Sequence, residues 1–163
     1  MSARDAVIVD AVRTPVGKRN GSLAKVHAVD LSAHVLTALA ARNGFDPAVV
    51  DDVIWGCVQQ VGQQGGDVAR MAVLAAGWPE SVPGTTVDRQ CGSSQQSVHF
   101  AAAGLVSGQY DVAVAGGAEM MAEKWGLSRG QLDEFSSASH AKLAAAIDEG
   151  RLAGQIAPGP RPC

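Results

Sequence analysis

Short runs of β-branched and apolar residues alternate along the chain with segments of helical periodicity, and this alternation constrains the fold more than any other feature. The runs predict strands at residues 6–12, 50–58, 84–90 and 110–121. The periodic segments predict helices at about residues 31–43, 67–76 and 92–107. Strands that alternate with helices predict a layered α/β fold with a mostly parallel central sheet and flanking helices.

Cap residues and glycines indicate where these helices begin and end. Asp46 before Pro47 is typical of the start of a short helical turn. Asp67 is placed to cap the second helix, and Gly44 and Gly77 are placed to end the first two. In the last helix, Val98, Ala102 and Leu105 form the predicted apolar stripe.

Composition excludes several classes of protein. Hydrophobic residues make up 47% of the 163 residues and aromatic residues only 4%, so small aliphatic side chains must fill most of the core of a globular domain. The net charge is -3 and there is no basic run, which argues against a nucleic-acid partner. No apolar segment is long enough for a membrane span, so no membrane association is expected.

The three cysteines are widely and irregularly spaced. Cys57, Cys91 and Cys163 match neither a disulfide framework nor a metal-ligand motif, so we expect no metal. A reduced, cytoplasmic location fits this usage best.

The amino-acid composition of the sequence changes after Met121. Residues 122–150 are charged and of helical composition, with Ser128 as an expected N-cap, and three prolines follow in the last ten residues. We therefore expect a first domain at residues 1–121 and a second, smaller region with an irregular tail at 122–163.

Cys91 lies where the strand at 84–90 is expected to turn into a helix. Backbone N–H groups and the positive end of the helix dipole would favour a thiolate there, and could also hold a developing oxyanion. Gly92, Ser93 and Ser94 would keep the approach to the sulfur open. Two interpretations follow: a catalytic nucleophile that takes up an acyl group, or a small residue buried in the core.

The residues around Cys91 resemble a known family, the thiolases, which are acyl-CoA acyltransferases. The segment DRQCGSSQQSVHFAAAGLVSGQYDVAVAGGAEMM is similar to the thiolase nucleophile segment. The ketoacyl synthases, which are related condensing enzymes, usually carry an ACSSS-like stretch instead, so CGSSQQ and GGAEMM favour thiolase. The resemblance covers nearly the whole chain, because three further segments match thiolase sequences: residues 7–31, 60–77 and 122–146.

This resemblance implies an enzyme that works through an acyl-cysteine. Cys91 would attack a 3-ketoacyl-CoA, release acetyl-CoA, and pass the remaining acyl group to a second CoA; in reverse, two acyl-CoA molecules condense. Coenzyme A is implied as the substrate carrier, with no permanently bound cofactor, and no residue is assigned to binding it. The family also implies a homo-oligomer, a dimer or a tetramer. The QCGSSQQ stretch is similar to the branch that acts on bulkier acyl-CoAs, including steroid side chains.

The chain departs from the thiolase pattern in two ways. The activating histidine and the second, acid/base cysteine of the family lie in a C-terminal domain whose motifs do not occur here. A long stretch of the family is also missing where Met121 runs directly into Ala122. We therefore expect a truncated and internally shortened thiolase. The alternatives are a non-catalytic thiolase-like remnant or partner subunit, and a ketoacyl-synthase-like module.

Four other residues invite a functional interpretation. His99 is eight positions after Cys91, about 12 Å along a helix, which is too far for a general base. Cys57 lies in an apolar strand and is interpreted as core. Glu119 is interpreted as structural. Arg70 matches a family position near the dimer interface, where an ion pair, a contact across subunits and a substrate contact all remain open.

Overall fold

The computed structural model describes residues 4–117, which lie in one compact unit. The predictions made for residues 118–163, including Glu119, the Ser128 cap, the irregular tail and the region at 122–163, lie outside the described residues.

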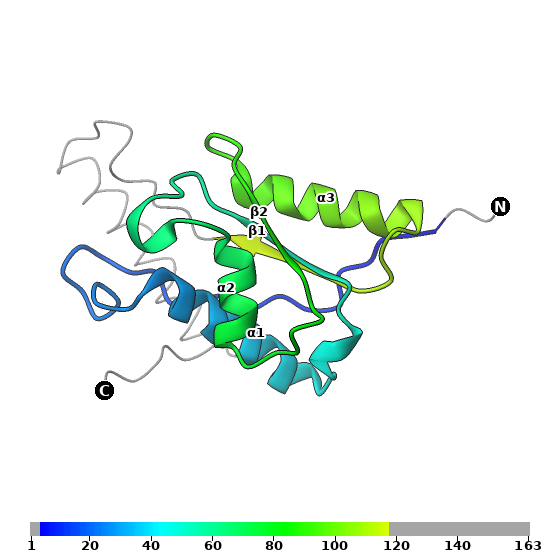
Figure 1. Ribbon diagram of the computed structural model, residues 1–163, viewed down its shortest axis with the longest axis horizontal. Helices are drawn as coiled ribbons and strands as arrows, with labels where there is room; N and C mark the ends of the chain where they lie inside the picture. Colours follow the sequence, from blue (N-terminus) through cyan, green and yellow to red (C-terminus); the bar gives the residue numbers. More distant parts are fainter. Residues whose placement is uncertain (1–3, 118–163) are drawn as a thin grey trace, which may run out of the picture. The chain divides into compact units, whose positions relative to one another are not determined.

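The centre of the described part is a parallel sheet of three strands (Figure 1). Strand β1, Asp52–Gly56, lies in the middle, between β2, Gly84–Val87, and β3, Ala113–Gly117. Both outer strands run parallel to β1. All five residues of β1 are buried, because neighbours cover this strand on both edges and both faces. The predicted parallel α/β architecture is confirmed.

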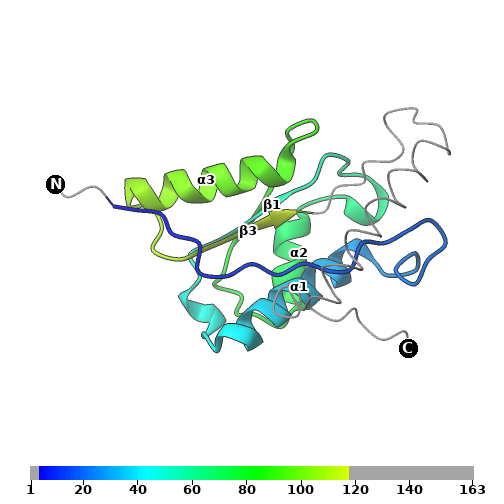
Figure 2. The same ribbon diagram turned by 180° about the vertical axis from the view of Figure 1, so that it is seen from behind.

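Helices cover both faces of this sheet. Helices α1, Ala28–Asn43, and α2, Val68–Ala75, lie on one face, and α3, Ser93–Ser107, lies on the other (Figures 1 and 2). Two short 3₁₀ turns, η1 at Pro47–Val49 and η2 at Gly62–Gln64, join these elements. None of the helices that the structure describes is long and apolar enough to cross a membrane.

The predicted helix ends are confirmed where the structure describes them. Gly44, with φ 65°, ends α1 in the left-handed conformation that glycine adopts readily. The Asp46 carboxylate accepts the N–H of Ala48 at 3.0 Å at the start of η1.

The main core lies between the sheet and the helices α1 and α2. It consists mostly of aliphatic side chains, together with Trp55 and Trp78, and Phe45 packs against it. Phe45 meets Trp78 edge to face, with ring centroids 6.0 Å apart. Five aliphatic residues of this region are almost fully buried: Leu36, Val53, Val68, Val73 and Val82.

A hydrogen-bond network joins the start of α2 to β2. Asp67 caps α2 by accepting the N–H of Arg70 at 3.1 Å, and it also accepts the hydroxyl of Thr86 at 2.6 Å. The Thr86 hydroxyl oxygen in turn accepts the N–H of Ala69 at 3.1 Å. One carboxylate therefore fixes the first turn of the helix and its distance from the strand.

The side of α3 that faces the sheet is built from small residues. Ser93, Ser97, Ala101 and Gly104 are buried, and the Ser97 hydroxyl lies 2.7 Å from the carbonyl oxygen of Gly116 in β3. The apolar stripe predicted for this helix does not form its buried face, because Val98, one of its members, is 43% exposed. That prediction is wrong. Small side chains let the helix backbone approach the sheet closely, so the larger ones lie on its flanks.

The strand predicted at residues 6–12 is wrong. The structure gives this segment no strand, and Val7, Ile8 and Val9 are 72%, 84% and 85% exposed. An ion pair between Arg4 and Asp111 holds one end of the segment. A β-branched run forms a strand only when it pairs with a neighbour, and β3 ends the described sheet on its side without pairing to these residues.

Asp51 fastens the start of β3 to the start of β1. Its carboxylate accepts the backbone N–H groups of Asp111, at 2.7 Å, and Val112, at 3.0 Å. These bonds favour the charged form and hold the pKa of Asp51 below its ordinary value.

The lowered pKa of Asp51 predicts a pH-dependent contribution to stability. Because the folded-state pKa lies below the unfolded value of about 3.9, the contribution is present above that pH and is lost as the pH falls through the folded-state pKa. We expect Asp51→Asn to lose less free energy of unfolding than the wild type between about pH 5 and pH 3. Urea unfolding at each pH measures this difference. Equal losses in both proteins would contradict the assignment.

Candidate active site

Cys91 lies on a tight turn between β2 and α3. The N–H of Gly92 donates to the carbonyl of Arg89 at 3.0 Å, which closes the turn with Gln90 and Cys91 at its centre. Cys91 has φ 59°, a left-handed conformation that non-glycine residues rarely adopt. Such a conformation costs of order 1–3 kcal/mol and persists only where surrounding contacts impose it. The side chain is exposed, so the interpretation of Cys91 as a buried core residue is wrong.

Ser93 supplies the contacts that impose this conformation. Its hydroxyl donates to the carbonyl of Arg89 at 2.9 Å and accepts the N–H of the same residue at 3.1 Å. Ser93 is fully buried. Instead of leaving space beside the sulfur, as the sequence suggested, this serine fastens the turn that presents it.

Two glycines let the start of α3 lie against the carboxyl ends of the strands. A Cβ on Gly56, at the end of β1, would lie 2.3 Å from backbone atoms of Ser93 and Ser94. A Cβ on Gly117, at the end of β3, would lie 2.3 Å from the Ser94 hydroxyl oxygen. Only glycine permits both approaches, and together they place the thiol at the carboxyl end of the sheet, where ligands bind in open parallel sheets.

A helix N-terminus and a cation lie at Gly92, the residue that follows Cys91. The N-cap of α3 is Gly92, which has no side chain to accept the first N–H groups of the helix. The guanidinium of Arg89 packs against the same glycine, since a Cβ there would lie 2.3 Å from Arg89 Nη1. Sequence reasoning did not single out Arg89, although a basic residue two positions before a cysteine was a usable signal.

Cys57 lies at the end of β1 and is structural. It is 1% exposed and belongs to the main core, so the sequence-based interpretation is confirmed. Its sulfur lies 3.5 Å from Gln64 Oε1 and 3.6 Å from the carbonyl oxygen of Gln59. Burial, with a smaller contribution from the negative charge of Asp88, raises the pKa of this thiol and keeps it protonated.

The remaining candidates lie away from the thiol or have structural partners. His99 is exposed on the outer side of α3. Arg70 donates to the carbonyl oxygens of Val82 and Glu80, so its guanidinium fixes the loop before β2. Among residues 4–117 there is no group of three or more histidine, cysteine or acidic side chains that could hold a metal ion.

Comparisons with known proteins identify the family. Residues 6–124 match the model of the thiolase N-terminal domain. The steroid 3-ketoacyl-CoA thiolase FadA6 of Mycobacterium tuberculosis is 42% identical, over 93% of this chain and 48% of the relative. A 3-ketoacyl-CoA thiolase of Saccharophagus degradans is 40% identical, over 96% of this chain and 49% of the relative.

A solved structure agrees with these sequence matches. The acetyl-CoA acetyltransferase of Bacillus anthracis superposes with a TM-score of 0.65 at 35% identity, covering 78% of this chain and 35% of that one.

These matches cover only part of each relative. The chain spans about half the length of the curated relatives it matches. The alignment with FadA6 is 197 positions long, more than the 163 residues of this chain, so it contains gaps where the relative has residues and this chain has none. On the match over residues 6–124, the chain belongs to the thiolase family, whose N-terminal domain it contains.

Proposed function

We propose that this chain carries the nucleophile of a thiolase-type acyl-CoA acyltransferase, and that Cys91 is that nucleophile. One observation carries the proposal: an exposed cysteine with φ 59°, in a matched thiolase N-terminal domain, on the turn that starts α3 at the carboxyl end of the sheet. The position leaves the sulfur accessible to an acyl group.

The chemistry proposed for Cys91 is the first half of a thiolase cycle. The thiolate attacks the keto carbon of a 3-ketoacyl-CoA, forming a carbon–sulfur bond, and the negative charge that develops on the oxygen is stabilised by backbone N–H groups at the turn. The bond between the keto carbon and the adjacent CH₂ then breaks. Acetyl-CoA leaves with the electron pair and takes up a proton, and the shortened acyl group stays on the sulfur. A CoA thiol later collects that group.

The contacts within residues 4–117 support a distinct part of this proposed work. Ser93 and the two glycines hold the turn, and Arg89 packs against Gly92 within it. The family places the proton-transferring histidine and second cysteine in a domain that this chain does not match. The proposal for this chain therefore extends to the acyl-cysteine, and completion of the cycle needs groups from elsewhere.

The names of the relatives support a proposal for the substrate class. FadA6 is named for steroid 3-ketoacyl-CoA, and several other relatives for 3-ketoacyl-CoA, so we propose a 3-ketoacyl-CoA substrate with a preference for bulky acyl groups. We also propose a homo-oligomer, a dimer or a tetramer, in the cytoplasm. The two described cysteines, Cys57 and Cys91, are free thiols, which fits a reducing compartment. The two sequence regions, 1–121 and 122–163, remain our proposed domain division.

The decisive experiment is the intact mass of the protein after incubation with acetoacetyl-CoA. We expect one acetyl group on the wild type and on Cys57→Ala, and none on Cys91→Ala, because Cys91 is the exposed one of the two cysteines that the structure describes. Cys57→Ala is the matched control, since it removes a thiol from the same end of the sheet. A folded wild type that takes up no acetyl group would overturn the proposal and favour a non-catalytic thiolase-like remnant or partner subunit.

A further inference from the structure

Helix α1 begins with a histidine as its N-cap. The Nδ1 atom of His27 accepts the backbone N–H of Val29 at 3.2 Å. The usual N-caps are serine, threonine, aspartate and asparagine, which accept this bond through an oxygen atom. An imidazole nitrogen accepts a hydrogen bond only while it carries no proton. The cap of α1 therefore exists only when His27 is neutral.

The chain that precedes α1 is fastened at both ends of this helix. In the last turn of α1, Arg42 and Asn43 each donate to the carboxylate of Asp10, at 2.8 Å. At the first turn, the fastening is the His27 cap. Residues 11–26 run between these two points and are here called the strap; the segment can be followed in dark blue in Figure 2.

The two fastenings of the strap respond differently to acid. The hydrogen bond from Asn43, together with the charge of Arg42, holds the pKa of Asp10 below its ordinary value. The Asp10 end therefore stays charged and bonded in mildly acidic solution. Histidine is the side chain that takes up a proton between about pH 8 and pH 5. A fall in pH across this range removes the acceptor at one end of the strap and leaves the other end bonded.

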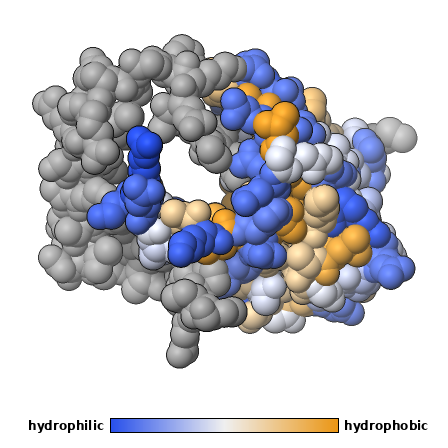
Figure 3. Space-filling model, turned by 60° about the vertical axis from the view of Figure 1, so that its left-hand side comes forward, coloured by the Kyte–Doolittle hydropathy of each residue, from blue (hydrophilic) through white to orange (hydrophobic). Residues whose placement is uncertain are grey.

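A proton on His27 would also add a positive charge where positive charge already gathers. The strap contains four basic residues and no acidic one: Arg13, Lys18, Arg19 and Lys25. Its loop lies at the left-hand end of Figure 1, the side that Figure 3 turns forward, and hydrophilic side chains project from that face. The N-terminus of a helix also repels a cation. Asp30, in the first turn of α1, is the acidic residue that opposes these effects.

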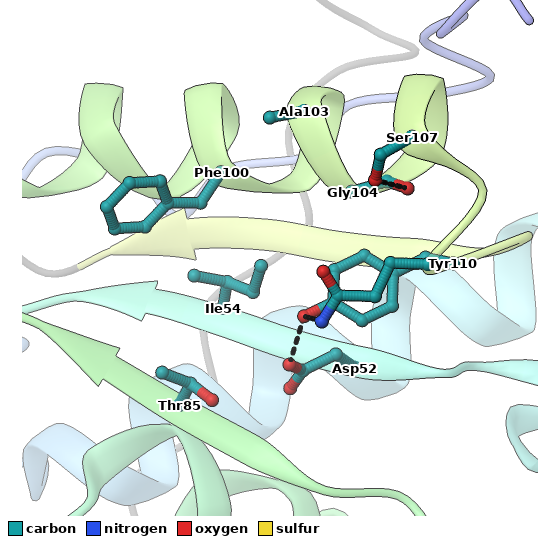
Figure 4. A pocket seen from close by; sticks show the side chains of 9 residues that line it. Asp52, Ile54, Thr85, Phe100, Ala103, Gly104, Ser107 and Tyr110 are labelled. Atoms are coloured by element: carbon teal, nitrogen blue, oxygen red, sulfur yellow. Dashed lines mark hydrogen bonds between the residues drawn. The ribbon is translucent and has the colours of Figure 1, made fainter.

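The elements packed against α1 supply few other charges. Helix α1 packs on α2 and on η2, and η2 has no charged residue. In α2, Arg70 donates to two backbone carbonyl oxygens, and Asp67 caps that helix. A second histidine, His34, lies on α1 itself. The bonded pair of Asp52 and Tyr110 lies beside α3, on the opposite face of the sheet (Figure 4).

We propose that His27 is a pH-sensitive fastening, which caps α1 and holds one end of the strap at neutral pH and releases both when Nδ1 takes up a proton. The body of α1 stays in place, because Val29 and Leu36 are buried in the main core. The part released is the basic loop before the helix. This device is independent of the acylation proposed for Cys91.

Amide hydrogen exchange of the full chain, followed by NMR, tests the proposal. The first N–H groups of a helix have no acceptor within the helix, so protection of the Val29 N–H reports on His27. We expect its protection factor, which corrects for the intrinsic pH dependence of exchange, to fall about 5-fold from about pH 7.5 to pH 5.5, as the loss of an ordinary N-cap implies. The Ala48 N–H is the matched control, because it donates to the carboxylate of Asp46 and should keep its protection.

Three variants separate the imidazole from the rest of the helix. His27→Asn supplies a cap with no proton to gain, so protection of Val29 should be the same at both pH values. His27→Ala should give low protection at both. His99→Asn removes an exposed histidine of α3 and should behave like the wild type. In the wild type, the heteronuclear NOE of Lys25 should fall in acid while that of Ala11, beside the Asp10 fastening, is retained.

Two results would overturn the proposal: protection of Val29 that does not change with pH in the wild type, or the same fall in His27→Asn. If the variants do not fold, the nitrogen NMR signals of the His27 imidazole in the wild type give the answer. We expect Nδ1 to carry no proton at neutral pH, and a proton found there would also overturn the proposal.

Discussion

Replacing Gly56 by alanine is expected to lower the free energy of unfolding by about 3 kcal/mol, at the upper end of what overpacking usually costs. The new Cβ would lie 2.3 Å from the backbone of Ser93 and Ser94, and backbone cannot move aside as a side chain can. Either α3 shifts from the sheet or β1 bends. Because the same residues fasten the Cys91 turn, we also expect Gly56→Ala to form less acyl adduct on Cys91 than the wild type.

Gly62→Ala is the matched control for this expectation. Gly62 has φ 58°, and a Cβ there would meet nothing within 4 Å, so alanine costs only its left-handed backbone, about 1 kcal/mol. Urea unfolding of the two variants under the same conditions gives the comparison. If both variants lose the same free energy, the close approach of β1 and α3 is not what requires glycine at position 56.

Asp67→Ala is expected to cost about 2–3 kcal/mol, through the loss of a helix cap and a charged hydrogen bond. The substitution removes the acceptor of the Arg70 N–H and of the Thr86 hydroxyl, and Thr86 then loses the orientation in which it accepts from Ala69. Because this network joins α2 to β2, we expect hydrogen exchange to quicken at the start of α2 and along β2.

Asp46→Ala provides the comparison for the capping part of this effect. Asp46 caps η1 through one N–H, that of Ala48, at an exposed position, so its loss should cost about 0.5–1 kcal/mol. Thermal unfolding of both variants measures the difference. Equal losses would mean that Asp67 acts as a cap alone and that its bond to Thr86 contributes little to stability.

The sequence predicted features that depend on local chemistry. Gly44 ends α1, and Asp46 and Asp67 start their helices, because a cap forms between residues that are close along the chain. The parallel sheet followed from the alternation of strand and helix patterns. The same local reasoning placed Cys91 at the junction of β2 and α3.

Features set by partners distant in the sequence could not be predicted in this way. The run at 6–12 has strand composition, but no neighbour in the described sheet pairs with it. The buried side of α3 was misjudged because glycines on the facing strands, Gly56 and Gly117, favour small residues over large apolar ones there. Periodicity alone cannot reveal such a facing surface.

In the candidate site, too, local features could be predicted and contacts between distant residues could not. Cys91 was identified from its own segment of sequence. The hydrogen bonds between Ser93 and Arg89, and the packing of Arg89 on Gly92, required the structure. The buried carboxylate of Asp52 is a further example. Its partner Tyr110 lies 58 residues away in the sequence, and nothing in either segment indicates that they meet.

The order of strands in the sheet also determines when the thiol turn can be assembled during synthesis. The central strand β1 pairs with β3 in a register that joins Asp52 to Ala113, so the ribosome must add some sixty residues before this pairing can begin. Gly117, which contacts Ser94 beside the turn, is the last residue of that strand. Such long-range parallel pairing is slow to form. A nascent chain therefore exposes Cys91 before the sheet can hold its turn in place, and the chain is vulnerable to oxidation and misfolding throughout that interval.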